Sequence, residues 1–107
     1  MKDSEISFDI LYKKLKYNEE SLEKIKEAYN YALKEHEGMK RLTGDDFITH
    51  PLHVADILVD LNVDDVTIIA ALLHEVLNNG NSTFEDIENK FGSEVATIVD
   101  NVSKISL

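Results

Sequence analysis

The sequence VTIIAALL, residues 66–73, is the most apolar stretch of this chain of 107 residues. A helix that is apolar on nearly all sides is normally buried at the centre of a bundle. The stretch is far shorter than the ~20 residues that a membrane-spanning helix needs. We therefore expect a central helix over residues 65–79, capped at its start by Asp64 or Asp65.

Apolar residues at intervals of three and four predict further helices on both sides of this stretch. They cover about residues 6–15, 19–37, 51–61, 84–91 and 93–105. Asn18 or Ser21 is expected to cap the second helix, and Gly38 to end it. Pro51 suits the first turn of its helix, and Ser82 with Glu85 has the form of a capping box.

Proline and glycine, at 1 and 4 residues, are too scarce for the turns of a sheet-rich fold. The predicted fold class is all-α: a compact bundle of five to six short helices packed around the central one. A chain of this length makes one domain, residues 1–107.

The composition excludes several classes of function. The chain has 11 Lys+Arg and 21 Asp+Glu, so its formal net charge is −10. Such a charge repels the phosphates of nucleic acids and of anionic lipids. The absence of cysteine rules out disulfides, thiolate metal sites and cysteine nucleophiles. Residues 1–5 lack the apolar run of a signal peptide. We expect a cytoplasmic protein that binds neither nucleic acid in general nor membranes.

His74 and Glu75 directly follow the apolar stretch. Burying an ionisable pair is costly unless it is paired or bound to a ligand. Imidazole and carboxylate together suit manganese, iron or zinc. The alternative interpretation is that the helix simply emerges into solvent there. His50, next to Pro51, favours a shared site on one face. His36 and His53, each taken alone, are typical of surface or helix-capping histidines, and His36 would suit a helix C-terminus.

Three stretches of the chain, in this order and spacing, resemble the start of the HD hydrolase domain of RelA/SpoT-type alarmone enzymes. The resemblance covers about residues 25–107, which leaves residues 1–18 as an extra N-terminal helix. The stretches are ALKEHEGMKRLTGDDFITHP (residues 32–51), AALLHEVL (residues 70–77) and FGSEVATIVDNVSK (residues 91–104).

The resemblance implies an all-helical, manganese-dependent enzyme that removes the 3′-pyrophosphate from (p)ppGpp. His50 and His74 match two metal-binding histidines of that family, and Glu75 stands where the family has the aspartate of its His-Asp pair. Arg41 matches an arginine that contacts the guanine nucleotide. Lys40 and Arg41 are therefore the expected nucleotide-binding residues.

The chain departs from the family pattern at positions that matter for catalysis. The family has Glu-Asp-Thr where this chain has Asn78, Asn79 and Gly80, and an amide cannot act as a general base. Glu75 is one methylene longer than aspartate, and Met39 replaces a glutamine. The family's last metal-binding aspartate follows on a later helix, and the sequence ends at Leu107. The catalytic positions Glu75, Asn78 and Asn79 thus form a degenerate set.

Three hypotheses follow. The first is a degenerate family member that binds a guanine nucleotide such as ppGpp, or a protein, with lost or weak hydrolysis. The second is an active Mn-dependent (p)ppGpp pyrophosphohydrolase or a related phosphohydrolase. The third is a structural piece that binds nothing. Without the later helices, apolar faces would stay uncovered, so we also expect a homodimer or a higher oligomer.

Overall fold

The computed structural model describes residues 7–40, 42, 44, 46–79 and 81–105. Apart from one isolated bridge between Lys40 and Asp46, these residues form helices, turns and loops. The predicted all-α class is confirmed. The helices are α1 (Phe8–Lys14), α2 (Glu19–Glu35), α3 (Thr49–Val59), α4 (Asp65–Leu73), α5 (Val76–Asn79), α6 (Phe84–Phe91) and α7 (Ser93–Ile105).

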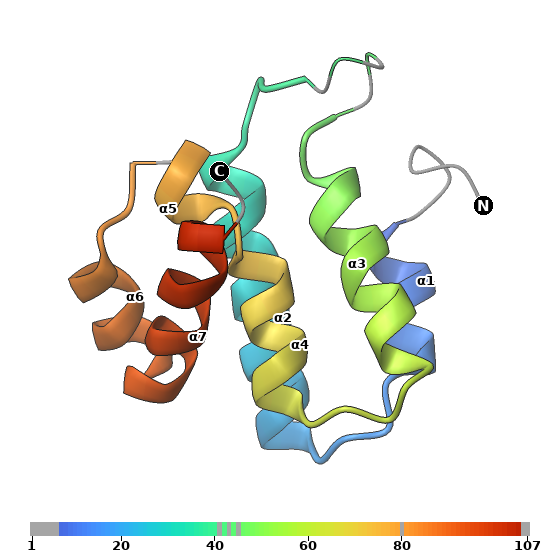
Figure 1. Ribbon diagram of the computed structural model, residues 1–107. Helices are drawn as coiled ribbons and strands as arrows, with labels where there is room; N and C mark the ends of the chain where they lie inside the picture. Colours follow the sequence, from blue (N-terminus) through green and yellow to red (C-terminus); the bar gives the residue numbers. More distant parts are fainter. Residues whose placement is uncertain (1–6, 41, 43, 45, 80, 106–107) are drawn as a thin grey trace.

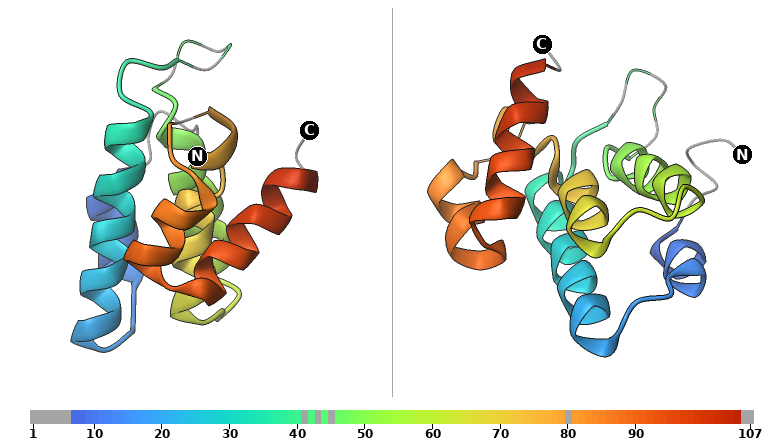
Figure 2. Two further views of the ribbon diagram at one scale, coloured as in Figure 1. Left: turned by 90° about the vertical axis from the view of Figure 1, so that its left-hand side faces the viewer. Right: turned by 60° about the horizontal axis from the view of Figure 1, so that its bottom comes forward.

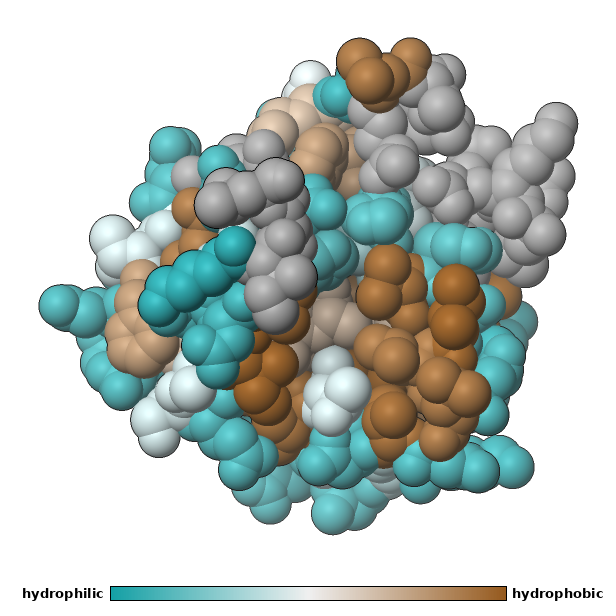
Figure 3. All heavy atoms as spheres, in the orientation of Figure 1, coloured by the Kyte–Doolittle hydropathy of each residue, from teal (hydrophilic) through white to brown (hydrophobic). Residues whose placement is uncertain are grey.

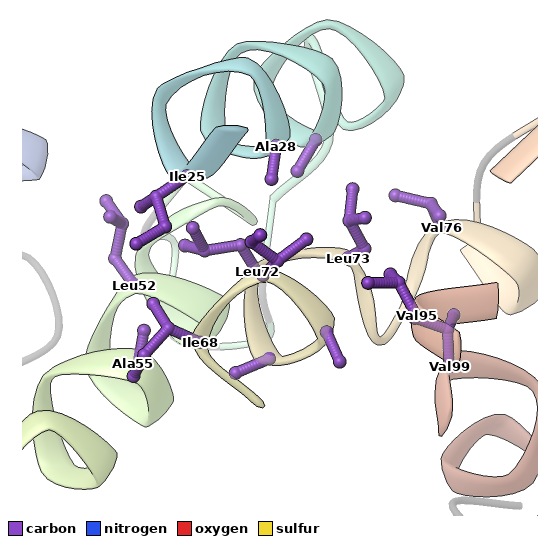
Figure 4. Close-up of a cluster of buried hydrophobic side chains, with 14 of the residues drawn as sticks. Ile25, Ala28, Leu52, Ala55, Ile68, Leu72, Leu73, Val76, Val95 and Val99 are labelled. Atoms are coloured by element: carbon purple, nitrogen blue, oxygen red, sulfur yellow. The ribbon is translucent and has the colours of Figure 1, made fainter. Parts of the chain in front are cut away.

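Helix α4 lies at the centre of the bundle, as its sequence predicts. Residues 68–73 are all buried, and α2, α3 and α7 pack around them (Figure 1). Figure 4 shows Leu72 facing α2, where Ile25 and Ala28 lie, and Ile68 beside Ala55 of α3. Each fully buried leucine or isoleucine contributes about 1.5–3 kcal/mol. The α4 side chains therefore hold three neighbouring helices together.

Helix α6 packs against α7 on the far side of α4 from α3 (Figures 1 and 2). The predicted capping box is one residue out of place. Thr83 caps α6 by accepting a hydrogen bond from the backbone N–H of Asp86, and the Asp86 carboxylate accepts one from the N–H of Thr83. Gly92 separates α6 from α7 with φ +97°, a conformation that glycine adopts without strain.

Helix α1 is tied to the bundle by polar and aromatic contacts. Lys14 Nζ lies 2.8 Å from Asp56 Oδ1 and 3.0 Å from Asp60 Oδ1, at the far end of α3 from the α2–α3 loop. The Phe8 ring stacks on Tyr29 of α2, with 4.3 Å between ring centroids. The predicted extra N-terminal helix is therefore an integral layer of the fold. Ile6, the first residue of the predicted helix, lies outside the described residues.

Two helix boundaries differ from the sequence prediction near the candidate site. Helix α2 ends at Glu35 rather than Glu37, and α3 begins at Thr49, so that Pro51 occupies its first turn. The Thr49 hydroxyl donates to the Asp46 carbonyl over 2.7 Å, which fixes the chain as it enters α3. In the described part of the chain, no helix has the length and apolar character needed to cross a membrane.

Candidate metal centre

The expected central helix breaks at His74. Helix α4 ends at Leu73, a turn holds His74 and Glu75, and the short helix α5 follows. The Ala71 carbonyl oxygen accepts from the His74 backbone N–H at 3.5 Å and from His74 Nδ1 at 2.6 Å. The expectation of one helix to residue 79 was therefore wrong. Adjacent helical side chains point about 100° apart, but His74 and Glu75 lie in the turn between α4 and α5.

The turn brings His74 and Glu75 to His50, in the first turn of α3. Glu75 Oε1 lies 3.2 Å from His74 Nε2 and 3.5 Å from His50 Nε2. The two imidazole rings are 5.5 Å apart between centroids. One ligand atom from each residue lies within 4.8 Å of the other two, so the three could hold a single ion. We call these three residues the His50–His74–Glu75 cluster.

His74 and Glu75 each favour the charged form of the other, as the members of an ion pair do. The hydrogen bond from His74 holds the pKa of Glu75 below its ordinary value, although burial opposes this. Burial is the largest influence on His74 and disfavours its charged form. The hydrogen bonds to Glu75 and to the Ala71 carbonyl outweigh burial and raise the pKa of His74. A cation would compete with the proton on His74, so metal binding should weaken as the pH falls.

The donor set fits a divalent transition metal. Two imidazoles and one carboxylate suit manganese, iron or zinc, and three protein ligands leave coordination positions open. Because the Ala71 carbonyl accepts from His74 Nδ1, Nε2 faces the cluster as the ligand atom. All three side chains are partly buried but remain reachable from solvent.

His36 and His53 do not belong to the His50–His74–Glu75 cluster. Of the two placements expected for His36, the surface one was wrong, because its exposed fraction is only 3%, whereas the residue does occupy the C-cap position of α2. Burial lowers the pKa of His36, which disfavours the charged form that would suit the helix dipole. The sequence held a signal for this burial: Ala28, Ala32 and His36 follow one another at intervals of four, and both alanines are fully buried. His53 is half-buried on α3.

Two of the other predicted site residues, Asn78 and Lys40, contact other parts of the chain. Asn78 Nδ2 donates a hydrogen bond to the Ser103 carbonyl of α7 over 3.2 Å. Lys40 Nζ forms an ion pair with the Asp46 carboxylate across the α2–α3 loop. Arg41 and the side chain of Asn79 lie outside the described residues.

A hollow of about 470 Å³ lies between the end of α2 and the start of α3. The buried side chain of His36 forms part of its wall. Its volume falls within the ~300–1,000 Å³ of small-molecule sites. Its lining mixes apolar and charged groups: Asn30, Leu33, Lys34, His36, Glu37, Gly38, Met39, Asp46 and Ile48.

Comparison with known proteins decides the family. The HD domain family matches residues 28–107, which include the whole cluster. The chain belongs to this family. The relatives place this HD domain in the RelA/SpoT type, as the sequence resemblance predicts.

Three relatives illustrate the similarity. A guanosine-3′,5′-bis(diphosphate) 3′-pyrophosphohydrolase of Aquifex aeolicus is 44% identical over 95 residues, 89% of this chain and 14% of that protein. The bifunctional (p)ppGpp synthase/hydrolase SpoT of Escherichia coli K12 is 41% identical over 87 residues, 81% of this chain and 12% of its own. A GTP pyrophosphokinase of Myxococcus xanthus is 44% identical over 85 residues, 79% and 11% of the two chains. The chain thus spans between 11 and 14% of the length of these relatives.

Proposed function

We propose that this HD domain is a cytoplasmic module that binds a divalent metal ion and a guanine nucleotide such as ppGpp, with lost or weak hydrolysis. The placement of His50, His74 and Glu75 carries the proposal, because ligand atoms of all three lie within 4.8 Å of one another and could hold one ion. Asn78, where the family resemblance implies a catalytic acid, donates to the Ser103 carbonyl.

In this proposal, the metal ion and the protein bind different parts of the same nucleotide. A divalent ion held by the cluster would bind phosphate oxygens, and Mn²⁺ is the ion that the family resemblance implies. The hollow beside His36 has room for a nucleoside, with Met39 and Ile48 as apolar walls. Lys40 and Arg41, in the adjoining loop, are the proposed cationic contacts to the nucleotide.

Weak hydrolysis is proposed because the side chains expected to activate water are amides. Asn78 presents an N–H group to a carbonyl oxygen, and a carboxylate could not make this contact because both groups are acceptors. The position thus serves the packing of α5 on α7. Asn79 likewise offers no group that can take up a proton.

An active Mn-dependent (p)ppGpp pyrophosphohydrolase or related phosphohydrolase is the second candidate. The intact cluster favours it, and so do relatives that are named for 3′-pyrophosphohydrolysis. This candidate needs a substitute base, which would be Glu75 itself or an acid from another subunit. Its weakness is that a Glu75 bound to a metal is a poor proton acceptor.

We also propose that the domain associates with a second copy of itself. A groove of about 320 Å³ with a mainly apolar lining runs between α3, α4 and α7, and hydrophobic side chains gather over α3 (Figure 3). Closed symmetric dimers are the commonest way to cover such a surface. A partner there would border the cluster, since His74 is part of the lining: Val54, Leu58, Thr67, Ala70, Ala71, His74, Ile98 and Val102.

Equilibrium dialysis against ppGpp, with Mn²⁺ and with a chelator, tests the binding proposal. We expect Mn²⁺-dependent binding by the wild-type chain and its loss in His74→Ala, with GDP binding more weakly than ppGpp. His53→Ala is the matched control, because it removes a histidine outside the cluster. Absence of ppGpp binding under both conditions would contradict the proposal.

A further inference from the structure

His36 is a buried polar side chain that the packing of the bundle does not account for. Only 3% of it is exposed, and neither Nδ1 nor Nε2 has a hydrogen-bond partner among the described residues. Burying an unsatisfied polar group costs about 1–3 kcal/mol. An apolar side chain would fill the same space without that cost. The imidazole is explained if it hydrogen-bonds to a ligand, or if it gains a hydrogen-bond partner when a ligand binds nearby.

The surroundings of His36 point toward the cluster. Its ring packs against Phe47 in the loop before α3, with 4.6 Å between centroids. Burial is the largest influence on the pKa of His36 and lowers it, whereas the charges of Glu75 and Glu35 act to raise it and that of His74 acts to lower it. His36 thus packs beside the loop that leads into His50, and its nitrogens lie outside the group of atoms that could hold one ion.

Metal binding would change what Glu75 contacts. Glu75 Oε1 lies 3.5 Å from His50 Nε2 and 3.2 Å from His74 Nε2. A ring nitrogen that binds a metal carries no proton, so neither Nε2 could then share one with Glu75. A neutral imidazole has one N–H to donate, and His36 has this group free of other described partners.

We propose that His36 is a positioning residue for the metal site: it donates a hydrogen bond to the metal-bound Glu75 carboxylate, directly or through one water. Such second partners orient a metal ligand, and their loss lowers metal affinity by about 10–100-fold. The inference rests on the proposed metal site and adds a residue to it. In this proposal, His36 lowers the stability of the metal-free domain and raises the affinity of the domain for the metal.

Titration calorimetry with Mn²⁺, combined with the melting temperature of the metal-free chain, tests this role. We expect His36→Phe to bind Mn²⁺ about 10–100-fold more weakly, while its metal-free melting temperature equals or exceeds that of the wild type. We expect the same of His36→Leu, which tests the role if the larger phenylalanine ring does not fit. His36→Gln, which keeps an N–H donor, should restore most of the affinity, and the control His53→Gln should not change it.

The results that would overturn the role of His36 can be distinguished from the result that would overturn the metal site. If the wild type binds Mn²⁺ and His36→Phe and His36→Leu bind it equally well, the inference is overturned while the metal site stands. If every His36 variant lowers the metal-free melting temperature and glutamine restores no affinity, His36 is merely structural and the inference falls. If the wild type binds no Mn²⁺, the proposed metal site and the inference fall together.

Discussion

The side-chain amide of Asn78 donates a hydrogen bond to the backbone carbonyl of Ser103 over 3.2 Å and so ties α5 to α7. Asn78→Ala should lower the free energy of unfolding by about 0.5–1.5 kcal/mol through loss of this bond. Asn78→Asp should lower it further, because a carboxylate would face the carbonyl as a second acceptor. Urea unfolding followed by circular dichroism measures both. An aspartate variant as stable as the wild type would show that the bond is dispensable.

His74→Ala should abolish the stabilisation of the domain by Mn²⁺. A ligand that binds only the folded state stabilises it by about 2.7 kcal/mol at 100 times its Kd. Thermal unfolding with and without Mn²⁺ measures this stabilisation, which we expect to vanish in His74→Ala and to persist in His53→Ala. An undiminished shift in His74→Ala would remove this residue from the metal site.

Asp64 should contribute to the loss of stability in acid. Hydrogen bonds from the Thr67 side chain and backbone to this N-cap carboxylate lower its pKa in the folded state. The contribution is therefore present above the pKa of the unfolded chain and disappears as the pH falls through the lower folded pKa.

Asp64→Asn keeps a capping oxygen but does not titrate. Between pH 7 and about pH 3, the wild type should therefore lose more stability than Asp64→Asn, as measured by urea unfolding at each pH. Parallel pH profiles for the two proteins would be inconsistent with this role. Asp64→Ala should cost about 0.5–2 kcal/mol at neutral pH.

The groove between α3, α4 and α7 predicts self-association. Leu58 lines this groove, whereas Ile57, 50% exposed on the same helix, does not. Size-exclusion chromatography with light scattering should give a dimer or larger species for the wild type and for Ile57→Glu. Leu58→Glu should give a monomer, since it places a charge in the apolar contact. A wild-type chain that elutes as a monomer would refute the prediction.

Much of the fold follows from local sequence signals. The apolar stretch of residues 66–73 predicts the buried central helix, and Asn18 and Asp64 cap the helices that the sequence assigns to them. These signals act within a few residues, so they can be found without the tertiary structure. The capping box of α6 was misplaced by one residue because Ser82 and Thr83 are both good caps, and only the structure shows that Ser82 instead donates to Glu35.

The site was harder to predict where side chains compete with the backbone. The pattern of residues 66–79 is helical throughout, and nothing in it indicates the turn at His74 and Glu75, where the Ala71 carbonyl accepts a hydrogen bond from His74 Nδ1. His36 was missed for a related reason: a histidine near a helix end is usually exposed. Its spacing from Ala28 and Ala32 shows that it lies on the buried face.

Incubation of the purified chain with ppGpp, with and without Mn²⁺, followed by ion-exchange separation of the nucleotides, measures whether the domain hydrolyses ppGpp. We expect ppGpp to be recovered essentially unchanged under both conditions. Rapid Mn²⁺-dependent release of GDP and pyrophosphate would contradict this expectation and would establish the domain as an active hydrolase.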